Sequence, residues 1–250
     1  MYCIGFTTVT FRKLSRADIC CLAAENGVSF IEWGGDVHLT VSDIKARNEI
    51  CKLNKKYSLK ALSYGSYYRL GEKNYNLWRE ICETADAVGA KTIRIWMGGK
   101  PSSEVSTEMF EEMLEETRRL ADIALEKEQT IAFEFHKGTY NDNGQSSVDF
   151  LSAVSRDNVK TYWQPFSDGR DEENLKTVLP YLEGVHVFHW NKRGKRYPFR
   201  RGVKQWKRFV SIIKESDTDI NYIMEFVKRD SPRRFAKDLK TLRMLLMQMY

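Results

Sequence analysis

The chain alternates short apolar segments with amphipathic segments along its length, and this alternation restricts its fold more than any other feature. Eight apolar runs, several of them apolar throughout, predict strands that are covered on both faces. These strands are predicted at residues 2–6, 29–33, 59–64, 92–96, 130–135, 160–163, 184–189 and 222–226. Capping residues and helical patterns predict helices at residues 15–26, 42–55, 76–88, 107–127, 172–181, 204–214 and 231–248.

Strands that alternate with helices form a parallel sheet, and about thirty residues per unit favour a closed (β/α)₈ barrel. We therefore predict an α/β fold of the TIM barrel type, with residues 1–250 as a single domain. The alternative is a doubly wound open sheet, which often carries a glycine-rich phosphate loop. Neither GxGxxG nor GxxxxGK[ST] occurs in the sequence, which favours the barrel.

The composition is that of a chain able to bury a large core, with 42% hydrophobic and 30% charged residues. No stretch approaches the roughly eighteen apolar residues of a membrane helix. The N-terminus enters the first predicted strand without the basic region and apolar core of a signal peptide. We therefore expect a cytoplasmic protein with no membrane partner. Its five cysteines form no CxxC, and we interpret them as small buried hydrophobes.

The net charge of +6 is concentrated in a few basic runs, at residues 192–196, 200–208 and 228–234. One interpretation is a solvated loop and helix face. The other is a site for a phosphate or another anionic group, because the first run directly follows His189 at a predicted strand end. Since the charge is local, we expect no nucleic-acid partner.

Polar residues stand where several predicted strands end. They include Glu134, Gln164, His189 and Glu225, which follow one another on the last four strands. In a barrel the carboxyl ends of all strands open at one mouth, so these side chains are expected to surround a single site. Two carboxylates, an amide oxygen and an imidazole suit one divalent metal, namely Mn²⁺, Mg²⁺, Co²⁺ or Zn²⁺.

Four segments carry a resemblance to a known family: residues 31–38, 133–136, 185–190 and 224–226. With them the chain resembles the xylose isomerase-like barrel superfamily of sugar and sugar-phosphate isomerases and epimerases. The family's metal ligands on strands five to eight are Glu, Asp, His and Glu, which implies Glu134, Gln164, His189 and Glu225 here. Gln164 stands in place of the usual Asp and removes one negative charge. Ser167 stands where many epimerases have a histidine.

The seventh strand holds two histidines, His186 and His189. Residues three apart in a strand point to opposite faces, so both cannot be ligands without distortion. We expect His189 to be the ligand, because it is nearer the strand end and its spacing to Pro198 matches the epimerase pattern. His186 is then expected to be structural.

The resemblance implies proton transfer next to a carbonyl, through a cis-enediolate, with Glu134 and Glu225 as the catalytic acid and base. The expected substrate is a small sugar or sugar phosphate, and the expected activity is isomerisation or epimerisation. Whether the chain forms a homo-oligomer stays open. Residues expected to contact the substrate are His38, His136, Tyr67, Trp96, Arg193, Lys195 and Arg196.

Three other functions belong to the same fold. A dehydratase acting on an inosose or a keto-acid would use the same ligands, and the sequence does not separate it from an isomerase. A sugar-binding barrel with a decayed metal site also stays open because of Gln164. An apurinic endonuclease of the endonuclease IV type is disfavoured, because four histidines are too few for three zinc ions and residues 192–199 contain neither Asp nor His.

Overall fold

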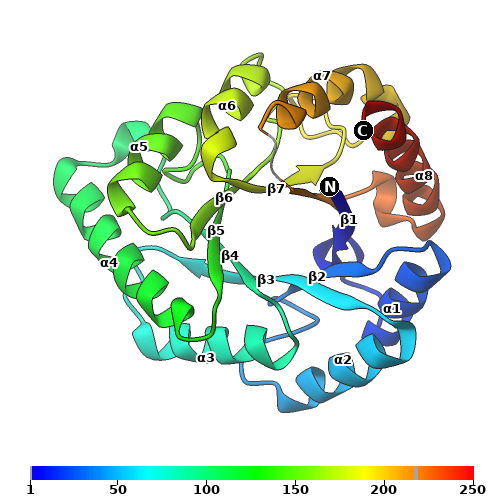
Figure 1. The fold of residues 1–250 in the computed structure, drawn as a ribbon, viewed down its shortest axis with the longest axis horizontal. Coiled ribbons are helices and arrows are strands. Elements are labelled where there is room, and N and C mark those ends of the chain that lie inside the picture. The colour runs from blue at the N-terminus through cyan, green and yellow to red at the C-terminus, as the bar shows by residue number, and fades with distance from the viewer. Residues whose placement is uncertain (1, 217–218) are drawn as a thin grey trace.

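The protein is described by a computed structural model that covers residues 2–216 and 219–250. Within these residues the chain forms a closed barrel of eight strands, each parallel to both of its neighbours (Figure 1). The predicted TIM barrel is therefore confirmed. The strands are β1 (Tyr2–Thr7), β2 (Phe30–Gly34), β3 (Lys60–Arg69), β4 (Thr92–Trp96), β5 (Thr130–Glu134), β6 (Val159–Trp163), β7 (Leu182–Val187) and β8 (Ile220–Met224).

The helices lie outside the barrel and cover the strands (Figure 1). At the start of the first of them, Ser15 and Asp18 form a reciprocal capping box. Among the described residues the helices are α1 (Arg16–Glu25), α2 (Ile44–Tyr57), α3 (Tyr75–Ala87), α4 (Thr107–Leu125), α5 (Gly144–Val154), α6 (Asp171–Val178), α7 (Val203–Lys214) and α8 (Pro232–Met249).

Helix α5 was not predicted from the sequence, because Gly144 and three serines are poor helix formers. A local cap and tertiary packing stabilise it. Asn143 caps its first turn by accepting a hydrogen bond from the Ser146 amide at 3.0 Å, and Phe150 is fully buried beneath it. Gly144 lies against α6, where a Cβ atom would come within 2.9 Å of Thr177. Packing therefore overrides the low local propensity.

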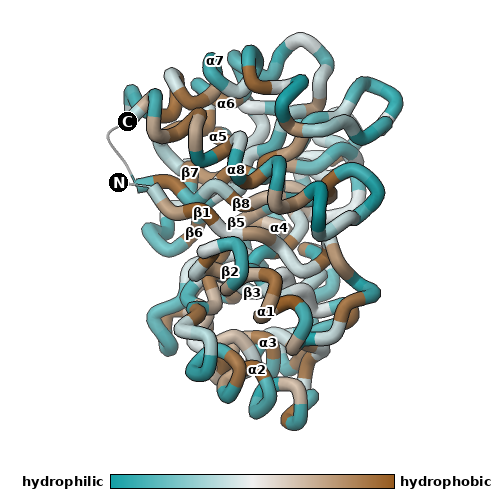
Figure 2. The backbone as a smooth tube through the Cα atoms, turned by 90° about the vertical axis from the view of Figure 1, so that its right-hand side faces the viewer, coloured by the Kyte–Doolittle hydropathy of each residue, from teal (hydrophilic) through white to brown (hydrophobic). Residues whose placement is uncertain are grey.

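The two faces of the barrel strands have different surroundings. Outward side chains such as Val185 and Val187 belong to the large core between the sheet and the helices. Ala132, Tyr162 and Ile223 face inward and form a small separate cluster inside the barrel. Figure 2 shows hydrophobic residues concentrated along the strands, whereas many outer turns are hydrophilic.

Two of the strand ends that differ from the predicted ones bear on the site. Strand β3 continues to Arg69, five residues beyond the predicted end, whereas β7 stops at Val187 and leaves His189 outside the sheet. The chain termini lie side by side, with the rings of Tyr2 and Tyr250 4.8 Å apart. None of the helices in the described part of the chain is long and apolar enough to cross a membrane.

Asp238 of α8 is a buried carboxyl that joins this helix to the loop before α7. It is 2% exposed and accepts a hydrogen bond from the Phe199 amide at 3.1 Å. Burial raises the pKa of Asp238 to about 6, above the value of about 3.9 expected in an unfolded chain. The charged carboxylate therefore opposes folding above pH 6, and this opposition disappears as the pH falls toward 4.

We predict that Asp238→Asn stabilises the protein at pH 7.5, because the amide is never charged. At pH 4.5 the folded protein holds the proton on Asp238, so the gap is expected to shrink to less than about half of its value at pH 7.5. Urea denaturation at several pH values measures this difference. A gap between variant and wild type that does not change with pH would contradict the prediction.

Candidate active site

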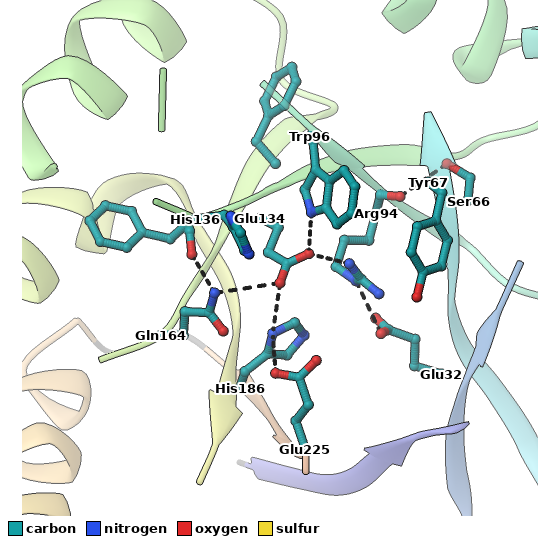
Figure 3. A network of polar contacts seen from close by, with 12 residues as sticks. Glu32, Ser66, Tyr67, Arg94, Trp96, Glu134, His136, Gln164, His186 and Glu225 are labelled. Atoms are coloured by element: carbon teal, nitrogen blue, oxygen red, sulfur yellow. Dashed lines mark hydrogen bonds and ion pairs between the residues drawn. The ribbon is translucent and has the colours of Figure 1, made fainter. Parts of the chain in front are cut away.

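Four side chains converge inside the barrel mouth, at or just beyond the ends of β5, β6, β7 and β8 (Figure 3). His186 Nδ1 lies 3.7 Å from Glu134 Oε1 and 3.5 Å from Glu225 Oε2. Gln164 Nε2 lies 3.5 Å from Glu134 Oε1. One ligand atom each from Glu134, His186 and Glu225 falls within 4.8 Å of the others, which is close enough for a single metal ion.

The structure brings His186, and not His189, to the two glutamates. This corrects the expectation that His189 is the ligand. Val185 and Val187 face the helices, so the residue between them must face the barrel interior. His189 lies beyond the strand end, where its ring is 6.0 Å from Tyr197 in an outer cleft between α6 and α7. The alternation of valine, histidine and valine was the sequence signal for this arrangement.

The surroundings of His186 and Gln164 fit a metal site. Both ring nitrogens of His186 are buried and have no hydrogen-bond partner among the described residues. Such orphaned groups are costly in a protein interior unless something binds them. Gln164 donates its amide N–H to the Phe135 carbonyl oxygen at 2.7 Å, which leaves its own Oε1 free to accept or to coordinate.

Arg94, which the sequence analysis did not single out, occupies the centre of this network. Its guanidinium donates to Glu32 Oε1 at 3.1 Å and to Glu134 Oε2. Trp96 Nε1 donates to the same Glu134 oxygen at 2.6 Å, and Ser63 donates to Glu32 at 2.8 Å. A charged residue between two outward isoleucines in β4 was the available signal, because such a residue must face inward.

The two glutamates of the site have different proton affinities. Burial alone would raise the pKa of Glu134, but the Arg94 guanidinium and His186 outweigh it and hold the pKa below its ordinary value. Burial raises the pKa of Glu225 to about 7. The carboxylate form of Glu134 is therefore favoured, whereas the pKa of Glu225 lies near neutral pH.

A cavity of about 320 Å³ opens above these groups. Glu134, Gln164 and Glu225 line its floor. Its aromatic wall is formed by loops that follow β6, β7 and β8 and consists of Phe166, Phe188, Trp190 and Phe226. The remaining lining includes His136, Lys137, Ser167, Asn191 and Lys192. The cavity is large enough for a small sugar and offers both apolar faces and hydrogen-bonding groups.

Three of the predicted substrate-contacting residues lie near the cavity and one does not. His136 lines the cavity and packs against Trp96 with ring centroids 5.7 Å apart. Tyr67 packs against the same indole at 5.3 Å. His38 is buried elsewhere, with Nε2 3.0 Å from the Leu14 carbonyl oxygen, and we correct its assignment to a structural role.

The basic loop after β7 meets the cavity through a different residue from those predicted. Lys192 lines the cavity, whereas Arg193, Lys195 and Arg196 are absent from its lining in the described structure. Arg196 pairs with Asp230 at 2.6 Å and lies 4.5 Å from the centre of the Phe226 ring. The substrate contacts expected of these three residues therefore stay a prediction, and Arg196 packs against a ring of the aromatic wall.

This fold and site define the class of protein: the chain belongs to the xylose isomerase-like TIM barrel family, which it matches over residues 21–245. It is similar to a 3-dehydroshikimate dehydratase from Bacillus anthracis, with 22% identity over 243 residues that cover 84% of this chain and 86% of the relative.

Solved structures have the same fold at low sequence identity. A probable 3-DHS dehydratase from Bacillus anthracis has a TM-score of 0.80 at 18% identity, covering 97% of this chain and 99% of the other. A barrel from Mycobacterium smegmatis in complex with magnesium has a TM-score of 0.78 at 16% identity, covering 100% and 98%. D-allulose 3-epimerase from Methylomonas sp. has a TM-score of 0.75 at 18% identity, covering 97% of each chain.

Gly65 of β3 provides the space in which Arg94 is seated. The two residues are partners in the sheet register, and a Cβ atom on Gly65 would lie 2.5 Å from Arg94 Nη2. We predict that Gly65→Ala lowers the free energy of unfolding by about 1–3 kcal/mol, because it overpacks a buried ion pair. Gly99→Ala is the matched control, since a Cβ atom there would meet nothing within 4 Å. Urea denaturation measures both; equal stability of the two variants would contradict this account of Gly65.

Proposed function

We propose that this protein is a divalent metal-dependent enzyme that transfers a proton at the carbon next to a carbonyl group of a small sugar or sugar phosphate. Isomerisation or epimerisation would result. The observation that carries the proposal is the convergence of Glu134, His186 and Glu225 beneath a cavity, with neither imidazole nitrogen of His186 hydrogen-bonded among the described residues.

The metal would be held by Glu134 Oε1, Gln164 Oε1, His186 and a Glu225 oxygen. This set of nitrogen and oxygen donors suits Mn²⁺, Mg²⁺, Co²⁺ or Zn²⁺. When bound, the metal supplies a Lewis acid that polarises the substrate carbonyl and orients the adjacent hydroxyl. His186 has to be neutral to ligate.

The two carboxylates have distinct tasks in this proposal. Apart from its contact with His186, Glu225 receives no hydrogen bond from any described residue, and it lines the cavity. It can therefore approach a substrate C–H bond and take its proton. Glu134 is held through Oε2 by Trp96 and Arg94, so that Oε1 faces His186 (Figure 3). A substrate between the two strands would meet one carboxylate on each side, as epimerisation requires.

The cavity walls support a small polyhydroxylated substrate. The four aromatic residues offer surfaces for the C–H faces of a sugar, while His136 and Asn191 offer hydrogen-bonding groups. Lys137 and Lys192 are the cations of the lining, and a phosphate or carboxylate of the substrate would lie near them.

A second candidate is a dehydratase acting on a keto-acid or an inosose. The similarity to the Bacillus anthracis dehydratase favours it. The first step would be the same, because Glu225 would remove a proton next to a carbonyl. The reaction would then differ in expelling a hydroxyl group instead of returning the proton.

The metal assignment is tested with two matched histidine variants. We predict that His186→Asn loses the bound metal, because it removes a buried ligand, whereas His189→Asn retains it. Gln164→Asp is expected to bind metal more tightly, because it restores a negative charge. Elemental analysis and Mn²⁺ titration measure the stoichiometry. Metal retained in His186→Asn would contradict the site, and metal bound only by Gln164→Asp would indicate a barrel that has lost its chemistry.

The catalytic assignment is tested by Glu225→Gln. Sugars, sugar phosphates and keto-acids are first screened with the wild type in D₂O, where NMR detects hydrogen exchange, epimerisation or loss of water. We predict that Glu225→Gln lowers turnover on the substrate found by about 10²–10⁴-fold, because the general base is removed while the fold is kept. Glu111→Gln, on the exposed face of α4, is the control. Full activity of Glu225→Gln would overturn the assignment.

A further inference from the structure

We propose that Arg94 is a resident counter-cation of the metal site, which positions Glu134 and weakens the binding of the divalent metal. The inference rests on the metal site proposed above and concerns a residue outside its ligand set. Arg94 is 4% exposed, and its guanidinium joins the carboxylates of Glu32 and Glu134 inside the barrel (Figure 3).

Neighbouring strands leave the space that the Arg94 side chain occupies. Arg94 lies in register with Gly65 of β3 and Ala132 of β5, which are the two smallest kinds of residue. The missing side chain of Gly65 leaves the space that Nη2 occupies. Glu32, which is completely buried, then holds the guanidinium from the side opposite Glu134. These contacts fix the cation beside the proposed ligand.

The charge of Arg94 acts directly on Glu134. Trp96 and Arg94 both donate to Glu134 Oε2, so only Oε1 remains to ligate. A metal at Oε1 would therefore share one carboxylate with a cation, and like charges a few ångströms apart in a buried site repel strongly. Gln164 adds no negative charge to compensate. Together these features predict weak, reversible metal binding.

A purely structural ion pair would be the competing explanation. A buried ion pair is, however, weak evidence for stability, because apolar residues of similar size often serve as well or better. Besides its pair with Glu32, Arg94 also engages a specific oxygen of the proposed ligand Glu134. The two explanations differ in one measurable property: a structural role leaves metal affinity unchanged once the variant is folded.

The test is Mn²⁺ titration calorimetry on four folded proteins: wild type, Glu32→Gln, Arg94→Lys, and the double variant Glu32→Gln with Arg94→Met. The double variant removes one charge of each sign, which avoids an unpaired buried Glu32. We expect it to bind Mn²⁺ at least tenfold more tightly than Glu32→Gln. Arg94→Lys keeps the cation and is expected to stay within threefold of the wild type.

The Mn²⁺ affinity of Glu32→Gln alone is a second test, which does not require the double variant to fold. Without Glu32, the charge of Arg94 is no longer shared, so the Mn²⁺ affinity is expected to fall at least threefold. Circular dichroism and thermal melting of the metal-free proteins check the fold. If Glu32→Gln and the folded double variant bind as the wild type does, the role of Arg94 is overturned while the metal site stands. If none of the proteins binds Mn²⁺, both proposals fail.

Discussion

The closed barrel imposes one constraint on which the rest of this structure depends: alternate residues of every strand face either the helices or the interior. The outward positions are apolar because the helices cover them. Inward positions near the carboxyl ends are therefore where strand residues can meet at the mouth. Glu134, Gln164, His186 and Glu225 occupy such positions on or just beyond four consecutive strands, which explains how residues far apart in sequence come within contact distance.

The second property of the barrel mouth is that two of its buried carboxylates are paired with a buried cation. Glu32, Glu134 and Glu225 are buried together, and Arg94 is the buried guanidinium that pairs with two of them. Burial of carboxylates without partners would be costly, so the cation makes the cluster tolerable in a folded chain. The same cation distinguishes the two glutamates of the site. Glu134 is held as an ionised side chain whose Oε1 faces Gln164 and His186, whereas Glu225 stays open to the cavity and able to exchange a proton.

The family connects this geometry with more than one reaction, since similar chains include an epimerase and a dehydratase. Both reactions can begin with removal of a proton next to a carbonyl, so one arrangement of carboxylates can serve either. In the proposed function the loops would decide between the two reactions, because they would determine how the substrate lies over Glu225. Here those loops supply an aromatic wall together with Lys137 and Lys192, and they differ from the site expected from the basic run alone.

The sequence by itself determined the order of the strands, the helices other than α5, the barrel, and the position of the two glutamates at strand ends, because local periodicity and strand-end position depend only on neighbouring residues. Tertiary structure alone decided three further points. Strand β7 ends at Val187, the last residue that pairs with β8. The side chain of His186, and not that of His189, therefore faces the site. The seat at Gly65 brought Arg94 to Glu134, forty positions away in the chain. Packing against α6 formed α5 from a segment of poor helix formers. Each depends on contacts between distant segments. A local pattern can indicate which face of a strand a side chain occupies, but it does not contain the partner that the side chain meets.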